Sequence, residues 1–212
     1  EYVTLAGAPG IAIPVRNVKG RIVGMQIRVD RPGAGKYLWL SSASQGGASP
    51  GTPVHVARPR DRREGSGRVW LTEGPLKADI ACERLSEIVL ALPGVNALGN
   101  FVPTVEELVQ RGELKELVVA LDSDWRDKPA VAKARNLVAE RAARAGVTVW
   151  LARWVSEHKG LDDLLLAGGR PTLEPYLVQG NGPRLLEDAQ ALAPRVWGPA
   201  LPLEEARKVQ QG

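Results

Sequence analysis

Residues 117–125 read LVVALDSDW, and this stretch decides the fold class of the chain. Its first five residues are apolar, as in a buried strand, and they lead directly into Asp122 and Asp124. Acids two positions apart on a strand point to the same side, with Cβ atoms roughly 7 Å apart. Their mutual repulsion is relieved where a cation or a proton lies between them. The stretch therefore predicts either a cation site at a strand end or an ordinary turn, since Asp and Ser are common turn residues.

The chain around this stretch alternates between strand and helix patterns. Predicted strands occupy residues 68–73, 88–94, 116–122 and 147–154, and predicted helices occupy 75–87, 104–112, 129–146 and 160–169. The first helix starts at Pro75, and its apolar positions are Leu76, Ile80 and Leu85. Thr104 is the predicted N-cap of the second helix. Strands separated by helices of this length predict an α/β fold with a mostly parallel sheet flanked by helices.

The first sixty residues have a different rhythm, with short strand patterns and no helix pattern. Residues 11–17, 21–30, 36–42 and 53–57 are predicted strands, the first two joined by a hairpin turn at Gly20. An arginine-rich tract at 57–68, ARPRDRREGSGR, is either an exposed loop or a phosphate-binding patch. We predict a small β-rich subdomain at 1–60, an α/β domain at 68–170 and a helical tail at 171–212.

Composition narrows the setting of the protein. One cysteine and two histidines among 212 residues exclude a disulfide framework and a zinc-ligand cluster, and the net charge of +4 is modestly basic. No apolar run is long enough to cross a membrane, and residues 1–10 lack the layout of a signal peptide. We therefore expect a cytoplasmic protein with no membrane partner. Because the sequence does not begin with Met, we also expect a piece of a longer protein.

Acids follow several of the predicted strands. The acidic positions at these strand ends are Glu73 after the first strand, Asp122 and Asp124 after the third, and Asp162 and Asp163 beyond the fourth. The carboxyl ends of parallel strands meet at one edge of a sheet, where open α/β sheets bind ligands. Hard divalent cations such as Mg²⁺ bind carboxylate oxygens together with waters and substrate phosphates. The whole set favours a cation site over a chance collection of turns.

Three motifs resemble those of the Toprim domain, which is shared by DnaG-type primases, topoisomerases and some nucleases. They are LTEGPLKAD at 71–79, VVALDSDW at 118–125 and HKGLDDLL at 158–165. The resemblance spans residues 68–169 and implies a Toprim fold. Where the primases carry Asp-Gly-Asp, this chain carries Asp-Ser-Asp.

The N-terminal part resembles the small subdomain that precedes Toprim in DnaG-type primases. The matching positions are Pro14, Gly24, Arg28, Lys36, Tyr37 and Leu38, with Ser41 and Ser42 close to a serine position. Topoisomerases and Toprim nucleases lack this block, so the resemblance favours the primase branch and extends over residues 11–169. Primase-like modules in replication proteins of phages, plasmids and other mobile elements are a closer parallel. The zinc-binding domain of the primases has no counterpart in this sequence.

The resemblance implies a DNA primase-like nucleotidyltransferase that makes short primers on single-stranded DNA from nucleoside triphosphates. It implies that Asp122 and Asp124 hold Mg²⁺ or Mn²⁺, joined by Asp162. Glu73 is then a metal ligand or the general base for the 3′ hydroxyl. A fused or associated helicase is the expected partner.

Five residues are candidates for binding nucleic acid or nucleotide: Arg28, Lys36, Lys77, Trp125 and Lys159. Arg28 and Lys36 correspond to primase residues that face the nucleic acid and nucleotide. Lys77 lies one turn into the helix after Glu73, where it either approaches a phosphate or is an ordinary solvated lysine. Trp125 follows Asp124 directly and offers a ring on which a base can stack.

Two alternatives to the primase remain open. A Toprim-type nuclease or topoisomerase-like enzyme shares the metal site, although no tyrosine here has the context of a topoisomerase nucleophile. An inactive nucleic-acid-binding module of a replication protein keeps the basic surface without the chemistry. Metal-dependent incorporation of nucleotides separates the primase from both.

Overall fold

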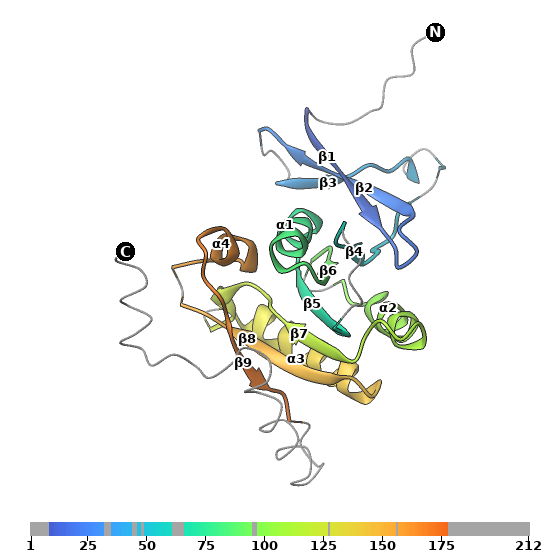
Figure 1. Ribbon diagram of the computed structural model, residues 1–212. Helices are drawn as coiled ribbons and strands as arrows, with labels where there is room; N and C mark the ends of the chain where they lie inside the picture. Colours follow the sequence, from blue (N-terminus) through green and yellow to red (C-terminus); the bar gives the residue numbers. More distant parts are fainter. Residues whose placement is uncertain are drawn as a thin grey trace. The chain divides into compact units, whose positions relative to one another are not determined.

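The computed structural model describes residues 9–31, 35–43, 46–47, 49–60, 66–94, 97–126, 128–155 and 157–177, except for the side chains of residues 124 and 126. The chain divides into two compact units, Glu1–Glu174 and Pro175–Gly212. The described strands form a three-stranded sheet and a six-stranded sheet, with helices packed on the larger one (Figure 1). The prediction of an α/β fold with a mostly parallel sheet and a small additional β-sheet is confirmed.

The larger sheet has the strand order β4-β6-β5-β7-β8-β9. Its four central strands are mutually parallel, and they are β5 Arg68–Glu73, β6 Ile88–Leu92, β7 Glu116–Val119 and β8 Thr148–Arg153. Parallel strands covered on both faces need nearly continuous apolar sequence. Trp70 and Trp150, from β5 and β8, are at most 1% exposed, so these large rings fill the core beside the sheet.

Four helices connect or follow these strands: α1 Pro75–Leu85, α2 Phe101–Gln110, α3 Pro129–Arg144 and α4 Leu161–Leu166. The step from β5 to β6 and the step from β7 to β8 run in opposite directions along the sheet. Right-handed crossovers therefore place α1 and α3 on opposite faces. α1 packs beside α4 and α2 packs beside α3, which gives the sheet two helical layers (Figure 1).

The buried face of α1 differs from the prediction. The residues that α1 buries are small ones, Pro75, Ala78, Ala81 and Cys82, whereas the predicted apolar positions Leu76, Ile80 and Leu85 are only partly buried. Small side chains let a helix backbone approach the sheet closely. A helix can therefore pack on a sheet through a stripe of alanines rather than through a stripe of larger aliphatic residues. The prediction of the buried face was therefore wrong: the observed face is rotated about the helix axis by part of a turn from the predicted one.

The start of α2 also differs from the prediction. The helix begins at Phe101 after Asn100, so Thr104 lies inside it, and the Thr104 hydroxyl donates to the Asn100 carbonyl at 2.7 Å. Pro103 is compatible with this earlier start because a first-turn residue has no intrahelical partner for its N–H.

The smaller sheet is antiparallel and has the order β1-β2-β3. Its strands are β1 Gly10–Arg16, β2 Ile22–Val29 and β3 Tyr37–Trp39, and Gly20 has a φ of 76° in the predicted turn between the first two. The fourth strand predicted in this region, β4 His55–Ala57, pairs antiparallel with β6 instead and belongs to the larger sheet. All three of its residues are buried, because it lies under part of α1.

Hydrogen bonds attach the β1–β2 hairpin to the larger sheet. The Arg16 backbone N–H donates to Nδ1 of the buried His55 at 3.0 Å, so the ring proton is on Nε2 and points at the Asp79 carboxylate, also 3.0 Å away. The Arg58 guanidinium donates to the Val18 carbonyl at 2.8 Å. These contacts run from the hairpin through β4 to α1.

The tail begins with a strand where the sequence predicted a helix. β9, Thr172–Pro175, is at the edge of the larger sheet, so the helical prediction was wrong for these residues, and 178–212 lie outside the described part of the chain. Among the residues that are described, no helix is long and apolar enough to cross a membrane.

Candidate metal and nucleotide site

A buried carboxylate with two lysine neighbours lies just beyond the end of β7. Asp122 is 5% exposed. The Lys77 ammonium donates to its Oδ1 at 2.6 Å, and Lys159 Nζ is 3.5 Å from its Oδ2. The carboxylate of the opening sequence motif thus has a cation on each oxygen, and both cations are among the predicted nucleotide-binding residues.

The turn between β5 and α1 brings Lys77 to this carboxylate. Glu73 is the last residue of β5, and Gly74 has a φ of 77°, a left-handed conformation that glycine adopts without strain. Pro75 then occupies the first helical position, where its missing N–H costs nothing. Lys77 follows in the first turn of α1, next to the carboxyl end of the neighbouring strand β7.

The serine of the Asp-Ser-Asp motif connects two loops at this edge of the sheet. The Ser123 N–H donates to the Lys159 carbonyl at 2.8 Å, and its hydroxyl donates to the His158 carbonyl at 2.9 Å. The Trp154 indole N–H donates to the same His158 carbonyl at 2.8 Å. These bonds hold the loop before α4 against the end of β7, which explains how Lys159 reaches Asp122.

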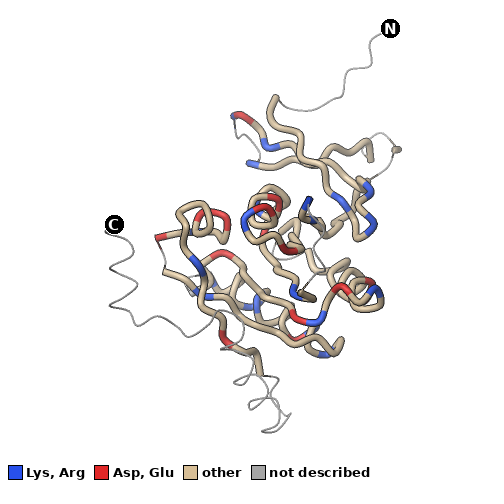
Figure 2. Tube along the Cα trace, in the orientation of Figure 1, with Lys and Arg blue, Asp and Glu red and all other residues tan. Residues whose placement is uncertain are grey.

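The start of α4 adds a second acid beside Lys77. A Cβ placed on Gly160 would be 2.2 Å from Asp162 Oδ1 and 2.9 Å from Lys77 Nζ, so both atoms crowd the same point. The Gly160 N–H donates to Asp163 Oδ2 at 3.0 Å, which directs Asp163 to the helix cap rather than to the site. In Figure 2, α4 carries only acidic positions, whereas α1 beside it carries both signs.

Electrostatic effects at Lys77 and Asp162 reflect this crowding. Burial favours the neutral form of the Lys77 amine, but the hydrogen bond and charge of Asp122, followed by the charges of Asp162 and Glu73, outweigh it and raise the pKa of Lys77. Burial raises the pKa of Asp162, the charge of Lys77 opposes that shift, and the charge of Asp163 adds to it. Lys77 therefore interacts electrostatically with Asp122, Asp162 and Glu73.

The oxygen donors suit a divalent cation, but Lys77 lies among them. Within the described part of the chain, no three or more His, Cys, Asp or Glu residues are placed to hold a metal ion. Carboxylate oxygens are nevertheless the donors that Mg²⁺ and Mn²⁺ prefer. Asp162 Oδ1 is buried and has no hydrogen-bond partner among the described residues, so this oxygen is available to a ligand. The ligand set predicted from the sequence, Glu73, Asp122, Asp124 and Asp162, therefore stays a prediction, and the side chain of Asp124 lies outside the described part.

Trp125 has neighbours that the sequence did not indicate. The Arg135 guanidinium lies 4.5 Å from the centroid of the indole, and that of Arg153 lies 5.5 Å from it. Arg153 in turn pairs with Glu174 at 2.6 Å. Base stacking on Trp125 stays a prediction, and the ring already makes cation–π contacts that tie the turn after Asp122 to α3 and β8.

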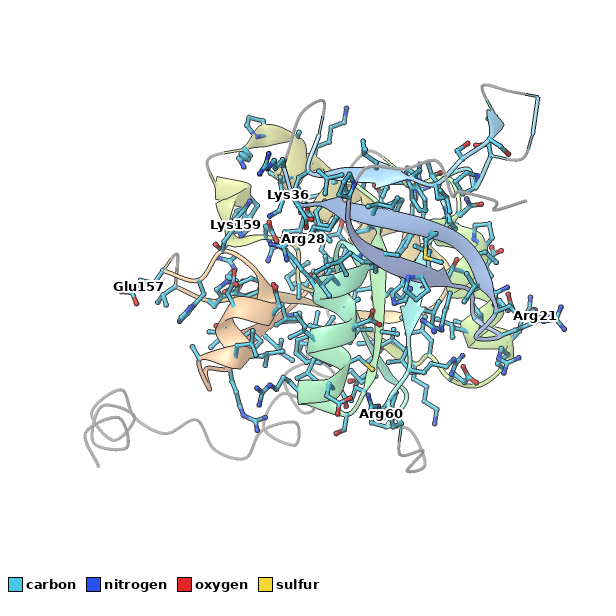
Figure 3. The ribbon with its side chains drawn as sticks, turned by 90° about the horizontal axis from the view of Figure 1, so that it is seen from above. Arg21, Arg28, Lys36, Arg60, Glu157 and Lys159 are labelled. Atoms are coloured by element: carbon cyan, nitrogen blue, oxygen red, sulfur yellow. The ribbon has the colours of Figure 1, made fainter. Side chains whose placement is uncertain are left out.

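Arg28 is on β2, and Lys36 directly precedes β3 of the same sheet. Arg28 pairs in register with Ile11 and Tyr37, which places it on the same face as the buried Ile13. The Lys36 ammonium lies 5.9 Å from the centroid of the Tyr37 ring. In the view of Figure 3, Arg28, Lys36 and Lys159 lie on one side of the first unit and Arg21 lies on the other.

Comparison with family models matches residues 64–172, just over half of the chain, to the family described as "Domain of unknown function (DUF3854)". The chain belongs to the DUF3854 family. Comparison of this DUF3854 chain with curated proteins gives no match.

Several solved structures are similar to this DUF3854 chain, and two of them have a TM-score above 0.5. The Aquifex aeolicus primase, represented by its zinc-binding and RNA polymerase domains, has a TM-score of 0.54 and 18% identity, over 75% of this chain and 37% of that one. The DnaG catalytic core has a TM-score of 0.52 and 16% identity, over 74% and 48% respectively. The chain therefore spans less than half of either relative. The fold is similar to part of a primase catalytic core, as the resemblance to DnaG-type primases predicted.

Proposed function

We propose that this chain is a primase-like catalytic module that joins nucleotides into short primers on single-stranded DNA, using Mg²⁺ or Mn²⁺. The observation that carries the proposal is the position of Asp122, a buried carboxylate between two lysines at the carboxyl edge of a primase-type sheet. Structural carboxylates are usually exposed or paired once, whereas a buried acid shared by two cations at this edge is typical of an active site.

The acids have distinct roles in this proposal. Asp122 and Asp124 are the main ligands of the ion, with Asp162 as a third. When bound, the ion supplies positive charge that neutralises the triphosphate and stabilises charge at the attacked phosphorus. Glu73 ends the strand beside β7 and either joins the ligands or accepts the proton of the attacking 3′ hydroxyl.

The basic residues bind the substrates in this proposal. Lys77 and Lys159 bind phosphates of the incoming nucleoside triphosphate at the acidic edge. Arg28 and Lys36 contact the template or the nucleotide from the smaller sheet, where Arg28 pairs with Tyr37, the residue after Lys36. We assign residues 1–60 to a small β-rich subdomain, apart from β4, which pairs in the larger sheet, and residues 68–170 to a Toprim-type catalytic domain. We expect a helicase as a fused or associated partner.

Primer synthesis is the direct test. The 212-residue chain is incubated with single-stranded DNA, labelled nucleoside triphosphates and Mg²⁺ or Mn²⁺, beside the Asp122→Ala and Asp124→Ala variants. We expect labelled products that fall to background in both variants and persist in Glu106→Gln, a matched change of an exposed acid on α2. Metal-dependent shortening of the DNA would assign a nuclease instead. DNA binding with neither product would assign a binding module.

A further inference from the structure

The Lys77 ammonium occupies the centre of the acidic edge. It donates to Asp122 Oδ1 at 2.6 Å and lies 2.9 Å from the point that a Gly160 Cβ would occupy. Asp162 Oδ1 lies 2.2 Å from that same point, yet it has no hydrogen-bond partner among the described residues. The charge of Glu73 also acts on the ammonium.

A divalent cation at this edge would need the same oxygens. An ammonium group and a metal ion both bind carboxylate lone pairs, and they repel each other at short distance. A carboxylate that is only 5% exposed also needs a counter-charge when no metal is present, because an unpaired buried charge is strongly destabilising. Lys77 provides that counter-charge, so metal binding requires that it leave.

We propose that Lys77 is an internal counter-ion of the candidate metal site, which a divalent cation displaces from Asp122 and which then binds the phosphates of the incoming triphosphate. This inference rests on the proposed function, because it concerns the same metal and the same substrate. It makes metal binding and triphosphate binding cooperative, since each removes an obstacle to the other.

The exposure and the length of the Lys77 side chain allow its ammonium group to leave Asp122. Its side chain is 26% exposed, so it can leave Asp122 for solvent without crossing packed protein, and its four-carbon stem allows many rotamers. Lys159 has a looser contact with Asp122, at 3.5 Å, and its side chain is 61% exposed. Lys159 is therefore a peripheral charge, and Lys77 is the cation that competes with the metal.

The first test measures Mn²⁺ affinity by calorimetry in the absence of nucleotide. Lys77→Met should bind Mn²⁺ about ten- to a hundredfold more tightly than wild type, as expected from the loss of one competing charge-assisted hydrogen bond. Lys133→Met, which removes an exposed lysine of α3, should leave the affinity unchanged. With Mn²⁺ present, Lys77→Met should bind inorganic tripolyphosphate more weakly than wild type.

A second test uses the wild-type chain and therefore does not depend on the folding of a variant. Lysines are acetylated briefly with and without Mn²⁺, and the extent of modification at each is read by mass spectrometry. Mn²⁺ should raise the modification of Lys77 several-fold and leave that of Lys133 unchanged. A structural lysine would give the same extent of modification in both conditions.

The outcomes separate the inference from the proposed function. If wild type binds Mn²⁺ while Lys77→Met binds it no more tightly and acetylation of Lys77 ignores Mn²⁺, the counter-ion inference is overturned and the metal site stands. If neither protein binds Mn²⁺, the metal-dependent function fails and the inference fails with it. Tighter binding in Lys77→Met together with metal-dependent acetylation supports both.

Discussion

Replacing Gly160 by alanine should weaken metal binding at the candidate site while leaving the stability of the fold almost unchanged. The backbone at Gly160 has φ −105° and ψ 163°, an extended conformation that alanine adopts without strain. The added methyl group would nevertheless be 2.2 Å from Asp162 Oδ1 and 2.9 Å from Lys77 Nζ. Both atoms are ends of side chains, so they can retreat, whereas packed backbone could not.

The expected magnitudes differ greatly between stability and metal binding. Alanine lowers the entropy of the unfolded chain, which stabilises by about 0.4–1 kcal/mol, and loses a similar amount as a poorer N-cap of α4. The free energy of unfolding should therefore change by less than about 1 kcal/mol. Asp162 Oδ1 must move by about 1 Å to reach the 3.4 Å of ordinary contact. Metal ligation tolerates about 0.2 Å, so Mn²⁺ affinity should fall at least about tenfold.

Urea unfolding and Mn²⁺ calorimetry on the same samples measure the two effects. Gly99→Ala is the matched control, because a Cβ at Gly99 would have no atom within 4 Å and its backbone is not left-handed. The control should leave Mn²⁺ affinity at the wild-type value. Wild-type Mn²⁺ affinity in Gly160→Ala would refute the assignment of Asp162 as a ligand. A loss of several kcal/mol in stability would refute the claim that only side-chain ends are crowded.

Three further predictions concern single interactions. Burial raises the pKa of Asp162, so the folded chain binds more protons than the unfolded chain above pH 3.8 and loses stability as the pH rises. Metal-free Asp162→Asn should therefore unfold at a higher urea concentration than wild type at pH 7, with the difference vanishing below pH 3.8; equal midpoints at pH 7 would contradict it. Ser123→Ala removes the hydroxyl bond to His158 and should cost about 1 kcal/mol in urea unfolding while weakening Mn²⁺ binding; a change in neither quantity would exclude the proposed role of Ser123. Burial alone would raise the pKa of Glu113, but its bonds to Arg58 and then Arg111 lower it, so this stability is present above pH 4.5 and is lost as the pH falls. Glu113→Gln should show a smaller loss of stability than wild type between pH 5 and pH 3 in thermal unfolding, and parallel pH profiles would count against the pairing.

The strands and the acidic edge could be predicted because they depend on topology. Continuous apolar runs predict buried parallel strands, and parallel strands bring their carboxyl ends to one edge whatever the side chains around them do. Glu73 and Asp122 are placed by that rule, whereas Asp162 lies on α4, beyond the end of β8. The partner of a short edge strand depends instead on packing, so His55–Ala57 was predicted with the smaller sheet although it pairs in the larger one. For the same reason Thr172–Pro175 was predicted as helix and is an edge strand.

Ser123 and Gly160 were not recognised as site residues. Their roles lie in contacts between loops that are 35 or more residues apart or in the space that a missing side chain leaves open. The signal available in the sequence was their position, since each directly adjoins an acid or a lysine of a motif. Serine in place of glycine in the Asp-Ser-Asp motif reads as a departure from the primase pattern, and the structure shows that its hydroxyl has a hydrogen-bonding role of its own.

The wrong face of α1 and the unrecognised pairing of Lys77 have one cause. The spacing of apolar residues predicted that Leu76 and Ile80 face the core. In that predicted orientation of the helix, nothing indicated where Lys77 points. Helix α1 instead packs through its small residues, and this rotation carries Lys77 to the flank that faces Asp122. A carboxylate at a strand end is placed by the sheet, but its counter-charge is placed by the rotation of a helix. That rotation follows from how closely the helix can approach the sheet, which is a property of side-chain volume rather than of hydrophobic periodicity. The packing of α1 through its small residues therefore decides whether the acids at this edge stand without a cation or, as observed, Asp122 is paired with Lys77.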